Sequence, residues 1–186
     1  MELSKPHMTS AVLVIDVQQG LCEGEGAAFD CTATIKRINA VTHKARLSRA
    51  PVVFVQHEST SGYLERGTPD WQLANGLEVL PSDIKVHKTT PDSFLRTNLE
   101  ELLRSHGVQQ LIVCGMHSEF CVDTTVRRAL SLGFPVVLVA DGHTSAGNEA
   151  ISAAQVIAHE NATLTNISSF GPRAVAVASA QVWFVA

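Results

Sequence analysis

Residues 111–129 read LIVCGMHSEFCVDTTVRRA, and this stretch decides the expected fold. Its first part is a short run rich in Leu, Ile and Val, which is typical of a buried strand. Residues 122–132 then carry apolar side chains at helical spacing and stop at Gly133, with Pro135 beyond it. The stretch therefore predicts a buried strand, a turn that begins at Gly115, and a helix.

Similar apolar runs recur on both sides of this stretch. The expected strands are residues 11–17, 51–57, 85–88, 110–115, 135–140 and 162–167. The expected helices are residues 34–49, 98–106, 122–132 and 149–159. Strand–helix–strand alternation implies right-handed crossovers and a parallel sheet with helices on both faces. We therefore expect a Rossmann-like α/β fold, a three-layer αβα sandwich.

Size and composition predict one folded domain over residues 1–186. Hydrophobic residues make up 45% and charged residues 17%, and we find no internal repeat or linker. The net charge of −4 without a basic run argues against nucleic acid or an anionic membrane as a partner. No apolar stretch has the length of a membrane span, and the first ten residues, MELSKPHMTS, lack an apolar signal core. We expect a cytoplasmic protein.

The cysteines are Cys22, Cys31, Cys114 and Cys121, with no CxxC pair and no Cys/His cluster at zinc spacing. In a reducing compartment we expect free thiols, with a Cys22–Cys31 disulfide as the alternative. Cys114 lies inside the apolar run LIVCG and is expected in the core.

Two segments do not fit the regular alternation. Residues 58–84 are rich in Gly, Pro, Ser and Thr, and a connection of this length in a compact domain is usually functional or partly structured. Residues 174–186 are apolar for a chain end. We expect this tail to pack either on its own domain or against another subunit.

Three reactive side chains fall near expected strand ends, where open parallel sheets bind ligands. Asp16 ends the first strand, Lys88 ends the third, and Cys121 lies at the start of the helix after the fourth. If the first and fourth strands are neighbours, the three side chains can converge. Each has a simpler interpretation alone: a loop cap, a solvated charge and a small buried hydrophobe.

Together these side chains suit nucleophilic catalysis. The positive charge of Lys88 and a helix N-terminus both favour the thiolate of Cys121. Asp16 can accept the thiol proton and deliver it to a leaving amine. Backbone N–H groups between residues 115 and 121 can bind the oxyanion that forms when sulfur attacks a carbonyl.

The expected pocket walls are aromatic or polar side chains near these strand ends. They are Gln18, His57, Trp71, Phe94, His117 and Phe120. Each of three residues has an alternative. Trp71 could pack against its own loop, His57 could have a purely structural role, and Phe94 could anchor the core.

The competing function is a non-catalytic α/β ligand-binding or regulatory domain. A receiver-like domain lacks support, because no acid follows Asp16 in VQQG. A dinucleotide-binding domain has even less support, because no Gly-rich phosphate turn follows the first strand.

The segments VIDVQQG, HKTTPDSF and residues 111–129 resemble the isochorismatase-like cysteine hydrolases, which include nicotinamidases and related amidases. The resemblance extends from residue 11 to about residue 167. It implies a six-stranded parallel sheet in the order 3-2-1-4-5-6 and a catalytic triad of Asp16, Lys88 and Cys121. It also implies a cis peptide bond between Met116 and His117, which directs the N–H groups of His117 and Cys121 into an oxyanion hole.

The sequence departs from the nicotinamidases after the second strand. Those enzymes carry an Asp and two His there as metal ligands, whereas VQHESTSGY contains only His57. We therefore expect no metal and no cofactor, and a substrate other than nicotinamide. A retained Cys121 favours hydrolysis of a C–N bond in a small molecule through a thioester. The resemblance and the apolar tail also suggest a homodimer or homotetramer.

Overall fold

A parallel six-stranded sheet forms the centre of the computed structural model, which describes residues 9–184. The strands are β1 (Ser10–Ile15), β2 (Val52–His57), β3 (Ile84–Lys88), β4 (Gln110–Met116), β5 (Val136–Thr144) and β6 (Ala174–Val177). Their order is β3-β2-β1-β4-β5-β6, and every neighbouring pair is parallel. This confirms the expected fold class and strand order.

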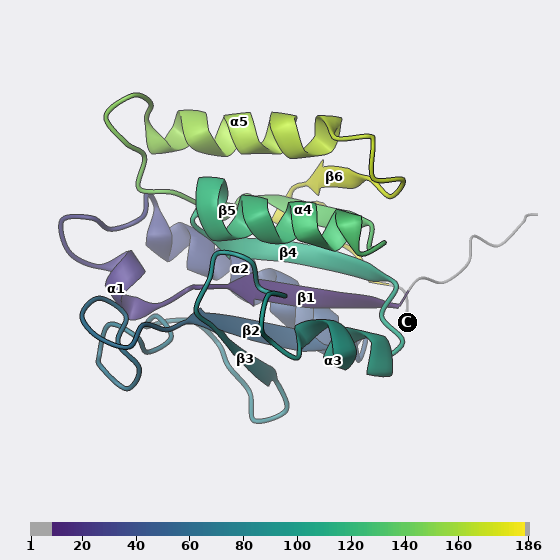
Figure 1. Cartoon of the computed structure of the whole chain (residues 1–186), viewed down its shortest axis with the longest axis horizontal. Coiled ribbons are helices and arrows are strands. Elements are labelled where there is room, and N and C mark those ends of the chain that lie inside the picture. The colour runs from purple at the N-terminus through teal and green to yellow at the C-terminus, as the bar shows by residue number, and fades with distance from the viewer. Residues whose placement is uncertain (1–8, 185–186) are drawn as a thin grey trace, which may run out of the picture.

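Helices cover both faces of the sheet. They are α1 (Gln19–Cys22), α2 (Cys31–Leu47), α3 (Leu99–Ser105), η1, a π-helix (Ser118–Val122), α4 (Asp123–Ser131), α5 (Ala153–Asn166) and η2, a 3₁₀ helix (Ser179–Gln181). Figure 1 shows α3, α4 and α5 on the near side of the sheet and α2 behind it. No helix between residues 9 and 184 is both long enough and apolar enough to cross a membrane.

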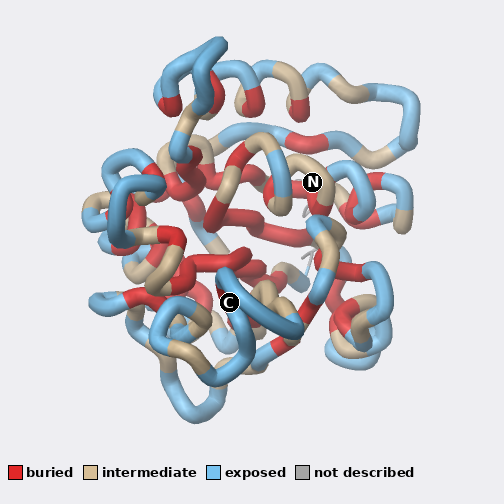
Figure 2. Tube along the Cα trace, turned by 60° about the vertical axis from the view of Figure 1, so that its left-hand side comes forward, coloured by how far each residue is buried: buried red, intermediate tan, exposed pale blue. Residues whose placement is uncertain are grey.

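The core consists of two apolar layers, one on each face of the sheet. Side chains of β1 alternate between them: Leu13 and Ile15 join the layer under α3 and α4, whereas Val12 and Val14 join the layer under α2. Figure 2 shows the central strands as buried over nearly their whole length. Burial on both faces is the reason why the strands read as continuous apolar runs.

The sixth strand lies elsewhere than the sequence suggested. Residues 162–167 were expected to form a strand, but most of them belong to the end of α5. A capping box between Ser152 and Gln155 starts this helix, and its buried positions, which include Glu160 and Leu164, follow helical spacing. The alternating pattern ATLTNI misled the prediction because the helix buries only one residue of it fully.

The apolar tail supplies the missing strand. β6 pairs with the edge of β5, and Val182 is buried on the same domain. Lys44 holds the following turn by donating hydrogen bonds to three carbonyl oxygens, those of Ser179, Ala180 and Val182. The described part of the tail thus packs on its own domain, the first of the two expected arrangements, while Trp183 stays exposed. Residues 185 and 186 lie outside the described range.

The expectation of four free thiols is wrong for one pair. α1 ends at Cys22 and α2 begins at Cys31, which brings their Cα atoms to 5.7 Å and joins them in a disulfide. The prediction failed because the number of cysteines and the expected compartment do not show that the chain brings Cys22 and Cys31 together. Cys114 is a free, fully buried core residue, as predicted.

Candidate active site

Asp16, Lys88 and Cys121 lie at or directly after the carboxyl ends of β1, β3 and β4. The carboxyl ends of the strands are on the left in Figure 1. Asp16 directly follows β1 with a φ of 50°, a left-handed conformation that Asp adopts more readily than most residues. Lys88 is the last residue of β3, and Cys121 belongs to η1 after β4. Because β1 has β2 and β4 as neighbours, the sheet order brings these distant segments of the chain together.

The Lys88 ammonium is the centre of this cluster. Its Nζ atom lies 2.6 Å from Asp16 Oδ2 and 3.3 Å from Cys121 Sγ. It also donates to the carbonyl oxygen of Thr90 at 3.1 Å and lies 3.3 Å from His57 Nδ1. The side chain of Lys88 is fully buried. The structure therefore brings together the three residues that the sequence singled out, with His57 beside them.

One carboxylate oxygen of the cluster has no assigned partner. Asp16 Oδ2 binds Lys88, whereas Oδ1 is buried and without a hydrogen bond within residues 9–184. A carboxylate oxygen of Asp16, a ring nitrogen of His57 and the sulfur of Cys121 lie within 4.8 Å of one another. Cys121, unlike Cys114, is only partly buried.

The surroundings of Cys121 favour the thiol over the thiolate. Burial and the negative charge of Asp16 raise the pKa of Cys121 to about 12, and Lys88 opposes this only in part. The sequence indicated the lysine and the helix start but not the degree of burial. Burial therefore favours the protonated form of Cys121, against the contribution that Lys88 makes to the thiolate.

A metal ion does not suit this cluster. Asp16, His57 and Cys121 form the only group of three potential ligands in the described residues. The Lys88 ammonium, however, already lies within 3.3 Å of an atom of each of them. A cation placed between the three would meet this buried positive charge, so the residues fit a hydrogen-bonded ammonium better than a metal.

The turn after β4 approaches β1 very closely. A Cβ atom at Gly115, whose φ is 123°, would overlap the carbonyl oxygen of Ile15. The next peptide bond, between Met116 and His117, is cis. The N–H groups of Phe120 and Val122 both donate to the carbonyl oxygen of His117, which closes the turn into η1. This is the turn for which the sequence predicted an oxyanion hole.

Gln18 supports the site rather than lining it with a free polar group. It is fully buried, and its Oε1 accepts a hydrogen bond from the N–H of His57 at 2.8 Å. Its Nε2 donates to the carbonyl oxygens of His57 at 2.9 Å and Trp71 at 2.8 Å. Both amide hydrogens are used, so Gln18 holds two expected pocket walls in place.

Phe94 belongs to the core, and its prediction as a pocket wall is wrong. It is 7% exposed and stacks on Phe134 with ring centroids 6.4 Å apart. The side chain of Asp92 accepts a hydrogen bond from its N–H at 2.8 Å and so fixes the turn that directs the ring inward. The alternative of a core anchor is the correct one.

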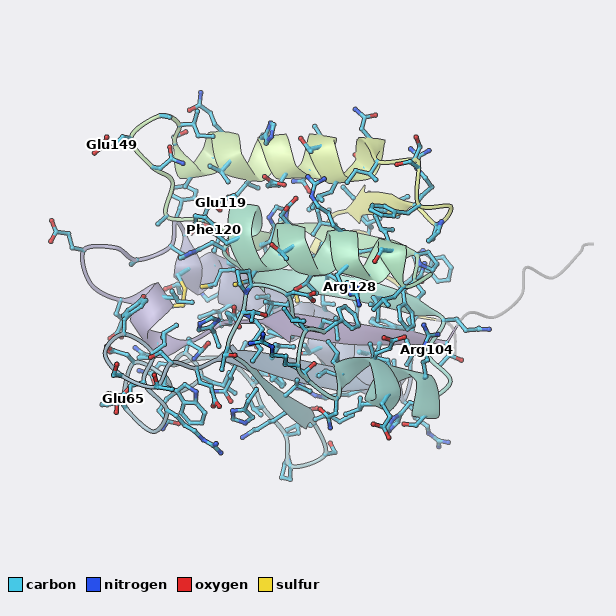
Figure 3. The ribbon with its side chains drawn as sticks, in the orientation of Figure 1. Glu65, Arg104, Glu119, Phe120, Arg128 and Glu149 are labelled. Atoms are coloured by element: carbon cyan, nitrogen blue, oxygen red, sulfur yellow. A yellow bond between two sulfur atoms is a disulfide. The ribbon has the colours of Figure 1, made fainter. Side chains whose placement is uncertain are left out.

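The other expected pocket walls remain at the edge of the sheet. Trp71 stacks on His87 at 5.4 Å, and its Nε1 is buried without a partner within residues 9–184. Phe120 is 56% exposed on η1, with its ring 6.4 Å from that of His117, and Figure 3 shows it beside the start of α4. Burial and the charge of Lys88 lower the pKa of His57, which favours its neutral form.

A family model described as the isochorismatase domain matches residues 10–169. The chain belongs to the isochorismatase family. Two curated relatives and one solved structure show the extent of the similarity.

Streptothricin hydrolase of Streptomyces noursei is 38% identical over 136 residues, which are 73% of this chain but 49% of that protein. The chain thus spans about half the length of this relative. The ureidoacrylate amidohydrolase RutB of Caulobacter vibrioides is 26% identical over 199 residues, covering 87% of this chain and 85% of that protein. A crystal structure of an isochorismatase family protein has a TM-score of 0.83 at 33% identity and covers 91% of this chain and 98% of that one.

This member of the family contains a second polar cluster that the sequence analysis missed. Ser118 and Glu119 of η1 face His143 and Ser145 at the end of β5, and Asn161 of α5 completes the group. The signal was present in the polar residues HTS that follow the fifth apolar run. Only the sheet order shows that residues 143–145 lie beside the end of β4.

Glu160 provides a pH-dependent test of the packing of α5 against α4. It is 7% exposed, and burial together with the nearby Asp123 raises its pKa to about 7. The folded protein therefore holds this proton more tightly than the unfolded chain, so the unfolding free energy falls as the pH rises through this window. Glu160→Gln should stabilise the protein by about 1–3 kcal/mol at pH 8 and change little at pH 5.

Urea unfolding of Glu160→Gln and wild type at both pH values measures this effect. Glu149→Gln, on the exposed loop before α5, is the matched control (Figure 3). An equal change at the two pH values would show that the carboxyl does not titrate in this range.

Proposed function

We propose that the chain is a cysteine hydrolase that cleaves a C–N, amide-like bond of a small molecule through a thioester. One observation carries the proposal: a fully buried ammonium lies 2.6 Å from the Asp16 carboxylate and 3.3 Å from the sulfur of the partly buried Cys121. This arrangement supplies a nucleophile, a base and a compensating charge within one cluster.

In the first half of the reaction, the sulfur of Cys121 attacks the carbonyl carbon while its proton passes to Asp16. The Lys88 ammonium stabilises the negative charge of Asp16 before the proton transfer, and the negative charge that develops as the sulfur attacks after it. The oxyanion of the tetrahedral intermediate accepts hydrogen bonds from the N–H groups of His117 and Cys121. Asp16 then returns the proton to the leaving nitrogen, the C–N bond breaks, and an acyl thioester remains on Cys121.

In the second half, water replaces the amine. Asp16, again a carboxylate, takes a proton from the water molecule as its oxygen attacks the thioester carbonyl. The C–S bond breaks, the proton passes from Asp16 to the sulfur, and a carboxylic acid leaves. Lys88 keeps its proton throughout and acts through its charge.

The cluster favours this proposal over a non-catalytic binding domain. A buried ion pair with a carboxylate oxygen lacking a partner is costly compared with apolar packing, so it is retained where it has a chemical task. A binding domain would have no need for a cysteine this close to a buried carboxylate. The names of two relatives, a streptothricin hydrolase and a ureidoacrylate amidohydrolase, also support amide-type substrates.

A panel of small amides, ureides, cyclic imides and lactams, including streptothricin and ureidoacrylate, tests the proposal by release of ammonia or amine. We expect wild type to hydrolyse at least one compound and Cys121→Ala to lose that activity. Cys114→Ala, which changes the other free cysteine, should retain it. Full activity in Cys121→Ala, or no hydrolysis of any compound in the panel, would count against the proposed function.

A further inference from the structure

The strand β5 contains a bulge that changes the direction of its last residues. Val113 of β4 pairs with Leu138 of β5, but Gly115 pairs with His143, so residues 139–142 lie opposite Cys114 alone. A Cβ atom at Gly142 would lie 2.6 Å from Cγ1 of Val139, so any other residue in this tight bend would force the buried Val139 to move. Bulges often re-aim side chains beside functional sites. Here the bulge brings His143 to the turn after β4.

His143 links three elements through hydrogen bonds. Its Nδ1 lies 2.7 Å from Ser118 Oγ at the start of η1, and its Nε2 lies 3.2 Å from Asn161 Oδ1 on α5. Asn161 Nδ2 donates in turn to the carbonyl oxygen of Ala140 at 3.0 Å. Ser118 and His143 are both essentially inaccessible, so Ser118 is not a nucleophile in spite of its histidine partner.

The direction of each hydrogen bond follows from the last contact. Because the amide nitrogen of Asn161 donates to Ala140, the amide oxygen is the atom that faces His143. The Nε2 atom of His143 must therefore carry the hydrogen, which leaves Nδ1 of the neutral ring as an acceptor. Ser118 consequently donates its hydroxyl hydrogen to His143. Burial lowers the pKa of His143, against the opposing effects of Asn161, Asp141 and Glu119, and this favours the neutral ring.

A second contact holds η1 to the same strand end. Ser145 Oγ donates to Glu119 Oε1 at 2.7 Å. Residues two apart on a strand point to the same side, so His143 and Ser145 both reach η1, whereas Thr144 points away and donates to the carbonyl oxygen of Phe29. Figure 3 shows Glu119 and Phe120 at this junction, beside the start of α4.

We propose that His143 is a positioning residue for Cys121, and that it acts through its hydrogen bond to Ser118. Ser118 directly follows the turn formed by Met116 and His117, and it begins the single π-helical turn that carries Cys121. Fixing Ser118 therefore fixes both the sulfur and the N–H groups proposed for the oxyanion. The inference rests on the proposed function for its effect on hydrolysis, but not for its effect on the thiol.

Three variants separate the hydrogen bond from simple packing. His143→Leu removes both ring contacts, Ser118→Ala removes only the hydroxyl, and His143→Asn keeps an acceptor near the position of Nδ1. His159→Asn, an exposed histidine on α5, is the matched control. The full-length variants are compared by the pH profile of Cys121 alkylation with iodoacetamide, by kcat and KM for an amide found in the panel, and by thermal unfolding.

We expect His143→Leu and Ser118→Ala to lower kcat about 10–100-fold, with KM changed less than about threefold, because small displacements of reacting groups are costly. Both should also shift the pH profile of Cys121 alkylation. The double variant should be no worse than His143→Leu alone, because that substitution already removes the hydrogen bond that Ser118→Ala removes. His143→Asn should recover most of the activity and the wild-type profile, and His159→Asn should match wild type.

A folded Ser118→Ala or His143→Leu with wild-type kcat and alkylation profile would overturn the inference, whatever its melting temperature. So would a His143→Asn variant as impaired as His143→Leu. If His143→Leu does not fold, Ser118→Ala decides the matter, since it removes a single oxygen atom. If no compound in the panel is hydrolysed by wild type, the proposed function fails, while the alkylation profiles still test the positioning.

Discussion

Asp16→Asn should make Cys121 react faster with iodoacetamide and hydrolyse substrate more slowly. The negative charge of Asp16 helps to raise the pKa of Cys121, whereas Lys88 lowers it. Removing the carboxylate leaves the ammonium beside the sulfur, so the pKa of Cys121 falls and the thiolate fraction at neutral pH rises. The same substitution removes the base on which the proposed hydrolysis depends.

We expect alkylation at pH 7 to accelerate by roughly tenfold or more and kcat/KM to fall by about 10²–10⁴-fold. Asn adopts positive φ as readily as Asp, so the backbone at position 16 is preserved. Asp30→Asn is the matched control, because Asp30 is exposed and has the same φ of 50°. Cys114 is inaccessible, so labelling reports on Cys121.

Two results would contradict this prediction for Asp16→Asn. If Asp16→Asn slows alkylation and hydrolysis together, the resting sulfur is already a thiolate and the carboxylate has another task. If alkylation is unchanged, Asp16 and Cys121 do not interact electrostatically in solution.

Lys88→Met should have the largest effect on stability. Its side chain is fully buried, and Met has a similar length, so the change removes the charge with little loss of packing. The Asp16 carboxylate then remains buried without its partner, which typically costs about 3–5 kcal/mol. Hydrolysis should also be lost, because no charge then compensates the developing thiolate.

Urea unfolding at pH 8 measures this change. Lys85→Met is the matched control, since Lys85 is an exposed residue of the same strand. Adding Asp16→Asn to Lys88→Met removes both charges and should restore most of the stability at pH 8 without restoring activity. Equal free energies of unfolding for Lys88→Met and Lys85→Met would show that losing the Lys88–Asp16 ion pair does not destabilise the protein as expected.

The fold was largely predictable because its strands are buried on both faces. Continuous apolar runs such as those at β1 and β4 differ from their helical neighbours in both length and pattern. The convergence of Asp16, Lys88 and Cys121 was also predictable, since each ends a strand or begins the helix after one. These inferences need only local sequence patterns and the general rules of parallel sheets.

The remaining features depend on contacts that no local pattern contains. Residues 162–167 alternate like a strand, but the capping box at Ser152 and the packing of α5 decide otherwise. Phe94 is directed inward by the turn at Asp92. The raised pKa of Cys121 depends on its burial, and the role proposed for His143 depends on a bulge that four residues of β5 create.

The most direct test of the account is to find the bond that forms during turnover. Wild type is mixed with a hydrolysed amide, quenched in acid within milliseconds, digested and weighed by mass spectrometry. The account predicts that the peptide containing Cys121 gains the mass of the acyl group, and that Cys121→Ala shows neither this adduct nor turnover. An acyl group on another residue, or turnover that survives in Cys121→Ala, would contradict it.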